Sequence, residues 1–212
     1  MGATQHDILL LSHKAVYNRR LSDDSSMQST NLTHHFLIAM PATADPFFSN
    51  TLTYICEHNE RGALGLVINR VTNLTLGNLF EQFNIPFTDP SFNELPVLFG
   101  GPVQLDCSFV LHQPAGNWQS TIVVNSALGL TTSSDILQAI ANGKGPEQTL
   151  VTLGYSGWAS GQIEHELTQN AWLTVNASPS IIFELPPDKR LSAAMELLGI
   201  NFSSLSGDAG HS

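Results

Sequence analysis

The chain has 212 residues, of which 42% are hydrophobic and 12% charged, a composition that predicts one large globular domain rather than a disordered chain. Its 18 acidic residues outnumber its 8 lysines and arginines, which gives a net charge of −10. Phosphate backbones and anionic membrane surfaces attract clustered cations, and here only Arg19-Arg20 and Lys189-Arg190 are adjacent, so we expect no direct binding to nucleic acid or membrane.

The first 26 residues differ from the rest of the chain. They show little hydrophobic periodicity, and a polar run, Ser22-Asp23-Asp24-Ser25-Ser26, ends just before Met27. The apolar run Ile8-Leu9-Leu10-Leu11 is shorter than the roughly 7–15 residues of a signal-peptide core. We therefore predict that residues 1–26 are a flexible extension, either an upstream start or a cloning remnant, and that residues 27–212 form the domain.

The first half of the domain is predicted to be rich in strands. Asn59-Glu60-Arg61-Gly62 is a four-residue turn with glycine last, which indicates a hairpin between the strands that flank it. Apolar residues at helical spacing, from Leu76 to Phe83, predict a helix that Pro86 ends. The apolar runs that predict strands are residues 36–40, 52–57, 63–68, 97–99, 108–111 and 121–124.

The second half adds helices at closer intervals. Ser134 is expected to cap a helix that ends at Gly143, and Pro187 to open a last helix that Gly199 closes. Between them the sequence predicts a helix over residues 161–169 and strands over residues 149–154, 172–175 and 181–184. Strands do not alternate regularly with helices, so the pattern favours a single-domain α+β fold over a doubly wound sheet.

Cysteine usage and hydropathy bear on the cellular compartment. Cys56 and Cys107 form neither a CxxC motif nor a disulfide framework. The sequence contains no run of 18 or more apolar residues, so no spanning helix is predicted. We therefore expect a cytoplasmic protein.

The segment from Gly154 to Trp172 carries the densest group of chemically useful side chains. A predicted strand runs into a glycine-rich turn with Ser156 and Trp158, and a short helix with two carboxylates, a histidine and two amides follows. Because backbone donors and side chains converge at strand-to-helix corners, we expect a site here.

Two side chains are candidate nucleophiles. Ser156 lies as in a nucleophile elbow, but Trp158 occupies the position at which G-x-S-x-G needs its second glycine, so a turn serine is the preferred interpretation. Cys56 and His58 share one strand face, but catalysis also needs an orienting third group. The apolar strand around Cys56 favours a buried structural thiol.

The sequence gives weaker support for a metal site, an acid–base pair or a phosphate-binding site. No two histidines have the i, i+4 spacing of a zinc-binding helix, and Glu164 and Glu166 diverge by about 200° on a helix, so we predict no metal and no shared-proton pair. Gly143-Lys144-Gly145-Pro146 lacks the P-loop spacing, and Gly100-Gly101-Pro102 is interpreted as a chain turn rather than an anion nest, so no cofactor is predicted. The metal-ligand candidates weighed are His34, His35, His58, His112, His165, Glu164 and Glu166.

A series of short motifs occurs in order across the domain, at residues 34–41, 45–48, 54–59, 65–69, 100–102, 154–155, 158, 161–162, 170–173 and 209–211. Each motif is weak alone, but together they resemble the YqgE/AlgH family of bacterial proteins. The resemblance implies a cytosolic α+β protein whose branched, mostly antiparallel sheet is flanked by helices. It also implies no established enzymatic activity and no agreed catalytic residues. The AlgH name derives from a proposed role in regulating alginate production.

Two hypotheses about function remain open. The preferred one is a non-catalytic regulatory or binding protein that acts through a protein partner or a small ligand, with indirect transcriptional regulation as one form. The alternative is a hydrolase-like enzyme with Ser156 or Cys56 as nucleophile and His58, His112 or His165 as base. A direct transcription factor is a weaker third option, which the charge balance opposes. The expected ligand- or partner-binding residues are Asn69, Gly100, Gly101, Ser156, Trp158 and Gln162.

Overall fold

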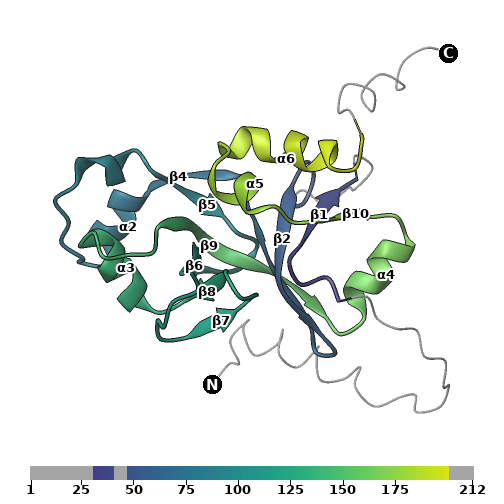
Figure 1. Ribbon diagram of the computed structural model, residues 1–212, viewed down its shortest axis with the longest axis horizontal. Coiled ribbons are helices and arrows are strands. Elements are labelled where there is room, and N and C mark those ends of the chain that lie inside the picture. The colour runs from purple at the N-terminus through teal and green to yellow at the C-terminus, as the bar shows by residue number, and fades with distance from the viewer. Residues whose placement is uncertain (1–30, 41–46, 201–212) are drawn as a thin grey trace, which may run out of the picture. The chain divides into compact units, whose positions relative to one another are not determined.

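A computed structural model describes residues 31–40 and 47–200 of the chain, and ten strands formed by these residues make one hydrogen-bonded sheet (Figure 1). The strands are β1 (His35–Ala39), β2 (Leu52–Asn59), β3 (Gly62–Val67), β4 (Val71–Thr75), β5 (Pro96–Phe99), β6 (Val103–Gln113), β7 (Thr121–Val123), β8 (Gly129–Thr131), β9 (Gln148–Ala159) and β10 (Trp172–Asn176). The helices are α2 (Leu76–Gln82), the 3-10 helix η1 (Pro90–Asn93), α3 (Ser134–Ala141), α4 (Gln162–Thr168), α5 (Pro179–Phe183) and α6 (Pro187–Glu196).

The long strand β9 is the point at which the sheet branches. Its first part pairs with β6, its middle pairs with β5 at Thr152 and Leu153, and its last four residues, from Ser156 to Ala159, pair with β3. The β5–β9 pairing is parallel, and the other pairings in the described part are antiparallel. The predicted α+β fold with a branched, mostly antiparallel sheet is therefore confirmed.

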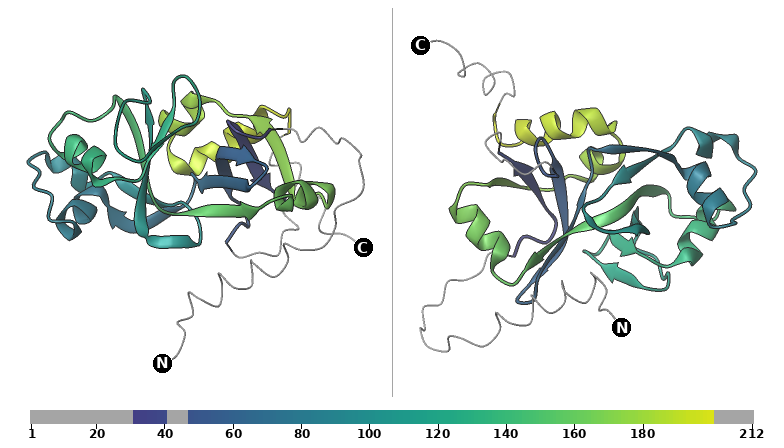
Figure 2. Two further views of the ribbon diagram at one scale, coloured as in Figure 1. Left: turned by 90° about the horizontal axis from the view of Figure 1, so that it is seen from below. Right: turned by 180° about the vertical axis from the view of Figure 1, so that it is seen from behind.

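Helices cover the sheet in separate places (Figures 1 and 2). Helix α6 packs against β1 and β2, with α5 beside it, whereas α2 and α3 lie toward one end of the sheet and α4 toward the other. Each place has its own apolar core. Phe36 and Tyr54 belong to the core under α6, Phe80 and Ile136 to the core between α2 and α3, and Trp158 to the core under α4.

Most predicted elements are present, but the strand predicted at residues 181–184 is wrong. This apolar run is helix α5, in which Pro179 occupies the first turn, where its missing N–H costs nothing. Ile181 and Ile182 are buried in the helix against the main core, so tertiary packing overrides their β propensity. Strands β4 and β8 and the helix η1 were not predicted.

Two smaller predictions also fail. Ser156 and Trp158 do not lie in a turn, because β9 continues through them to Ala159 and their backbones pair with β3. The strand-to-helix corner falls at Ser160-Gly161 instead. Helix α3 is preceded by Ser133 as its N-cap residue, so Ser134 is its first residue rather than its cap.

Several predicted segments lie outside the described residues. These are the predicted extension at residues 1–26, the motif positions 41, 45–46 and 209–211, and the first and last residues of the predicted domain. Within residues 31–40 and 47–200, none of the helices is long and apolar enough to cross a membrane.

Candidate functional site

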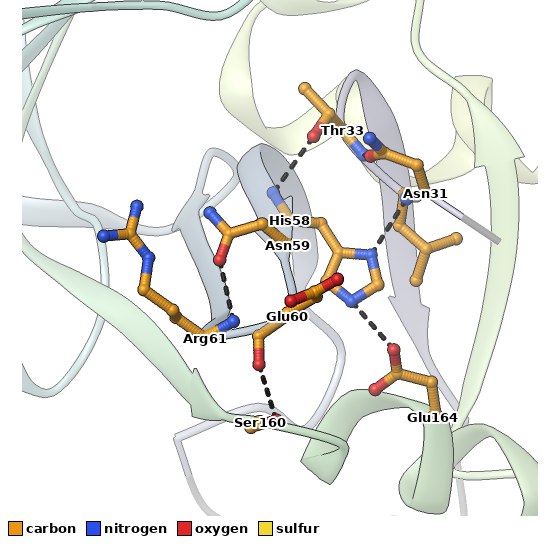
Figure 3. Close-up of polar contacts among 9 residues, drawn as sticks. Asn31, Thr33, His58, Asn59, Glu60, Arg61, Ser160 and Glu164 are labelled. Atoms are coloured by element: carbon orange, nitrogen blue, oxygen red, sulfur yellow. Dashed lines mark hydrogen bonds and ion pairs between the residues drawn. The ribbon is translucent and has the colours of Figure 1, made fainter. Parts of the chain in front are cut away.

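Polar side chains gather where the β2–β3 hairpin meets helix α4 (Figure 3). The hairpin lies close to β9 because Gly62, at a φ of +129°, has no side chain. A Cβ atom at Gly62 would lie 2.1 Å from the carbonyl oxygen of Trp158. The chain then turns at Gly161, at a φ of +72°, and α4 begins beside the hairpin. We call the residues His58, Glu60, Ser160 and Glu164, with Thr33 beside them, the hairpin corner.

His58 is the centre of the hairpin corner. Its residue surface is 6% exposed, and its Nδ1 accepts a hydrogen bond from the backbone N–H of Leu32 at 3.0 Å. The ring proton must therefore lie on Nε2, which donates to Glu164 Oε1 at 3.0 Å. The backbone N–H of His58 donates to Thr33 Oγ1 at 3.0 Å. Because both ring nitrogens have partners, the imidazole is fixed in one orientation and one tautomer.

Glu164 has one carboxylate oxygen that differs from the other polar atoms of the hairpin corner. Its Oε1 is oriented by His58, but its Oε2 is buried and has no hydrogen-bond partner among the described residues. A buried carboxylate oxygen without a donor is costly, and because 37% of the Glu164 side chain is exposed, a partner that contacts this side chain could supply the missing N–H or O–H group. The rim is held by Ser160, whose hydroxyl donates to the carbonyl oxygen of Glu60 at 2.6 Å (Figure 3).

The neighbouring carboxylate, Glu166, is fully engaged. Its Oε2 accepts hydrogen bonds from the indole N–H groups of Trp158 at 3.0 Å and Trp172 at 2.7 Å. Its Oε1 accepts from Gln162 Nε2 at 2.8 Å, and Gln162 Oε1 in turn accepts from the backbone N–H of Ala159. These contacts attach α4 to the sheet. Glu164 and Glu166 therefore have different partners, His58 for the first and Gln162 with the two indoles for the second.

Of the six predicted binding residues, Trp158 and Gln162 lie beside the hairpin corner, and the other four lie at the junction of β3, β5 and β9. There the hydroxyl of Ser156 donates to the carbonyl oxygen of Gly100 at 3.2 Å, and the next residue, Gly101, packs against the backbone of β9. Asn69 Oδ1 accepts from the backbone N–H of Leu52, and its Nδ2 donates to a backbone oxygen. All these polar groups have protein partners, so a ligand role for them stays a prediction.

The geometry does not support the alternative hydrolase. Ser156 is fully buried, and burial raises the pKa of the equally buried Cys56 thiol, which keeps it protonated. Within the described residues no histidine hydrogen-bonds either group. His58 has the partners given above, His112 contacts Pro114 O and Thr131 Oγ1, and His165 contacts Gln169. The described part also contains no group of three or more His, Cys, Asp or Glu residues arranged to hold a metal ion.

The contact between His58 and Glu164 is not predicted by the sequence, in which the two residues are separate candidates. His58 was placed correctly near the end of a strand, and Glu164 in the first turn of a helix. Their meeting depends on the pairing of β3 with β9, which orients the hairpin toward α4. No periodicity in either segment carries that information.

The fold and the hairpin corner together define a class of protein: an α+β chain with a branched, mostly antiparallel sheet and a histidine–carboxylate contact where a hairpin meets a short helix. The chain belongs to the AlgH-like family, DUF179, which it matches over residues 36–203. The resemblance seen in the motifs is thereby confirmed.

Similar proteins of known sequence include UPF0301 proteins of Nitrosospira multiformis and Nitrosomonas eutropha, 66% and 60% identical over 185 residues, which make up 87% of this chain and all of each relative. The solution structure of the AlgH protein from Pseudomonas aeruginosa is similar at 49% identity and a TM-score of 0.73, covering 91% of this chain and all of that one. A crystal structure of a Corynebacterium diphtheriae protein, at 16% identity and a TM-score of 0.63 over 85% of this chain and 91% of that one, shares the fold.

His112, away from the corner, should make the fold sensitive to acid. Its side chain is fully buried, and burial lowers the pKa of the imidazole below its usual 6.5, although the bond to Pro114 opposes this. Below about pH 6.5 the folded state therefore binds fewer protons than the unfolded state, and the free energy of unfolding falls as the pH decreases. We expect urea unfolding to show lower stability at about pH 5.5 than at about pH 7.5.

Two variants test whether His112 causes this pH dependence of the unfolding free energy. His112→Gln should lower stability at both pH values but reduce the difference between them, whereas His165→Gln, at an exposed position on α4, should leave the difference unchanged. Part of the difference should persist in His112→Gln, because burial also lowers the pKa of His34. Equal unfolding free energies of the unmodified chain at both pH values would contradict this expectation.

Proposed function

We propose that this protein is a non-catalytic binding protein with a regulatory role, and that it docks a protein partner at the hairpin corner. The observation that carries the proposal is the unpartnered, buried Oε2 of Glu164, held in place by a histidine whose own two nitrogens are occupied. A group that is rigidly positioned and lacks a donor is suited to recognition, because little conformational entropy is lost when a donor arrives.

The chemistry of the corner favours a partner that supplies N–H donors. A carboxylate accepts most strongly from lysine, arginine or backbone N–H groups, and the net charge of −10 would attract a basic segment. The predicted residues Trp158 and Gln162 would contribute indirectly, because both fix Glu166 and so the position of α4. The membership of the AlgH-like family is compatible with a regulatory role. The cytoplasmic location stays a prediction.

Affinity capture with the full chain tests the docking site. A partner recovered by the unmodified protein should be recovered at least about tenfold less by Glu164→Gln, since the loss of one charge-assisted contact has an effect of that order. The matched control is Glu81→Gln, the same change at an exposed position on α2. Gln162→Ala should weaken capture to a smaller extent.

The outcome is interpretable only if the variants fold, which thermal unfolding would verify. If Glu164→Gln and Glu81→Gln recover the same partner in the same amount, the hairpin corner is not the docking site. If a purified, folded chain turns over an ester or thioester and loses that activity in Ser156→Ala or Cys56→Ala, the protein is an enzyme and the proposal fails.

A further inference from the structure

Arg190 is a buried arginine in the first half of helix α6, away from the hairpin corner. The residue is 7% exposed and is one of the buried residues of α6. Its Nε donates to the carbonyl oxygen of Leu185 at 3.0 Å, and its Nη1 donates to the carbonyl oxygen of Ile68. The guanidinium therefore joins the loop before α6 to the chain just after β3.

The positive charge of Arg190 has no counterion in the described part of the chain. The acid nearest in sequence, Asp188, pairs with Lys189 at 3.4 Å on the exposed side of the helix. Burial lowers the pKa of Arg190 to about 10, and no carboxylate opposes that effect.

The hydrogen bonds to the two carbonyl oxygens do not explain why a charged side chain is buried here. A guanidinium carries five N–H donors, and the carbonyl oxygens of Leu185 and Ile68 use two of them. Nη2 makes no hydrogen bond within residues 31–40 and 47–200, and the residue retains an exposed fraction of 7%. An arginine held by its other nitrogens presents a fixed planar donor edge, a geometry that matches carboxylate and phosphate oxygens.

We propose that Arg190 is the centre of a binding site for a small oxyanion, a carboxylate or a phosphate group, which approaches the guanidinium from its Nη2 edge. The bound anion would neutralise a charge that the described chain leaves uncompensated. The site shares no residue with the hairpin corner, so the variants that test docking at Glu164 leave it intact, and either proposal can fail alone.

The experiment titrates the full chain, labelled with ¹⁵N, with inorganic phosphate and, in parallel, with acetate and citrate, at constant ionic strength set by sodium chloride. The readout is the Nε–H resonance of Arg190, identified by its absence from Arg190→Lys. A saturable shift of this resonance is expected, with a parallel rise in the melting temperature. A larger response to phosphate indicates a phosphate-bearing ligand, and a larger response to acetate or citrate indicates a carboxylate.

Two substitutions supply the comparison. Arg190→Met removes the charge but keeps the length of the side chain, and it should abolish the anion-dependent rise in melting temperature. Arg61→Met, at a side chain 89% exposed that pairs with Glu57, should retain it. An equal rise in both variants overturns the proposal. If Arg190→Met does not fold, the titration of the unmodified chain still tests the proposal. The proposal is overturned if none of the three anions shifts the Nε–H resonance, even at tens of millimolar.

Discussion

Replacing Gly101 with alanine is expected to abolish folding or to cost at least about 4 kcal/mol of unfolding free energy. A Cβ atom at this position would lie 2.2 Å from the carbonyl carbon of Tyr155 and 2.4 Å from the backbone nitrogen of Ser156. Both are main-chain atoms of β9, which cannot move without breaking the pairing of β9 with β3 and β6. The φ of +152° adds backbone strain that a side chain rarely tolerates.

The matched control is Gly143→Ala, just after the C-cap of α3. Gly143 also has a positive φ, +67°, but its Cβ atom would meet nothing within 4 Å. That change should cost about 1–2 kcal/mol, the strain of a left-handed alanine alone. Urea unfolding followed by circular dichroism measures both variants. If Gly101→Ala folds with the stability of Gly143→Ala, the close approach of the two backbones does not constrain the fold as we infer.

Much of the fold could be predicted because it depends on local patterns. The helix at Leu76–Gln82 and the helix at Ser134–Ala141 each bury an apolar stripe that recurs at helical spacing. The hairpin of β2 and β3 was recognised from a turn whose glycine, Gly62, adopts a φ of +129°. The branched sheet, in contrast, was implied by the family resemblance and not by periodicity.

The errors fall where contacts distant in sequence decide the local structure. The segment after Gly154 was interpreted as a turn because glycines favour turns, yet β3 and β6 provide partners that extend it as a strand. Residues 181–184 were interpreted as a strand because the run is apolar, yet Pro179 and burial on both isoleucines favour a helical turn. In the same way, Gly100 and Gly101 could be predicted to form a chain turn. The close approach of β9, which leaves no room for a side chain at either position, could not be predicted.

The second large effect is expected at Glu166. Glu166→Ala removes the acceptor of two indole N–H groups, and Trp158 and Trp172 are 6% and 5% exposed, so little water can replace the carboxylate. Each unsatisfied buried donor costs about 1–3 kcal/mol, so the free energy of unfolding should fall by about 3 kcal/mol or more. Glu81→Ala, at an exposed site, should change it by less than about 0.5 kcal/mol.

Glu166→Gln distinguishes the acceptor from the charge. A glutamine oxygen can still accept from both indoles, but its amide then faces Gln162, whose own oxygen is held by the backbone N–H of Ala159. We therefore expect a loss intermediate between the unmodified chain and Glu166→Ala, together with weaker near-ultraviolet dichroism of the tryptophans. Wild-type stability in Glu166→Ala would mean that the buried side chain of Ile163, packed in the core with both indoles, attaches α4 without the carboxylate. Because α4 carries Glu164, a loosened helix should also displace the carboxylate that His58 orients, which links stability at Glu166 to recognition at the hairpin corner.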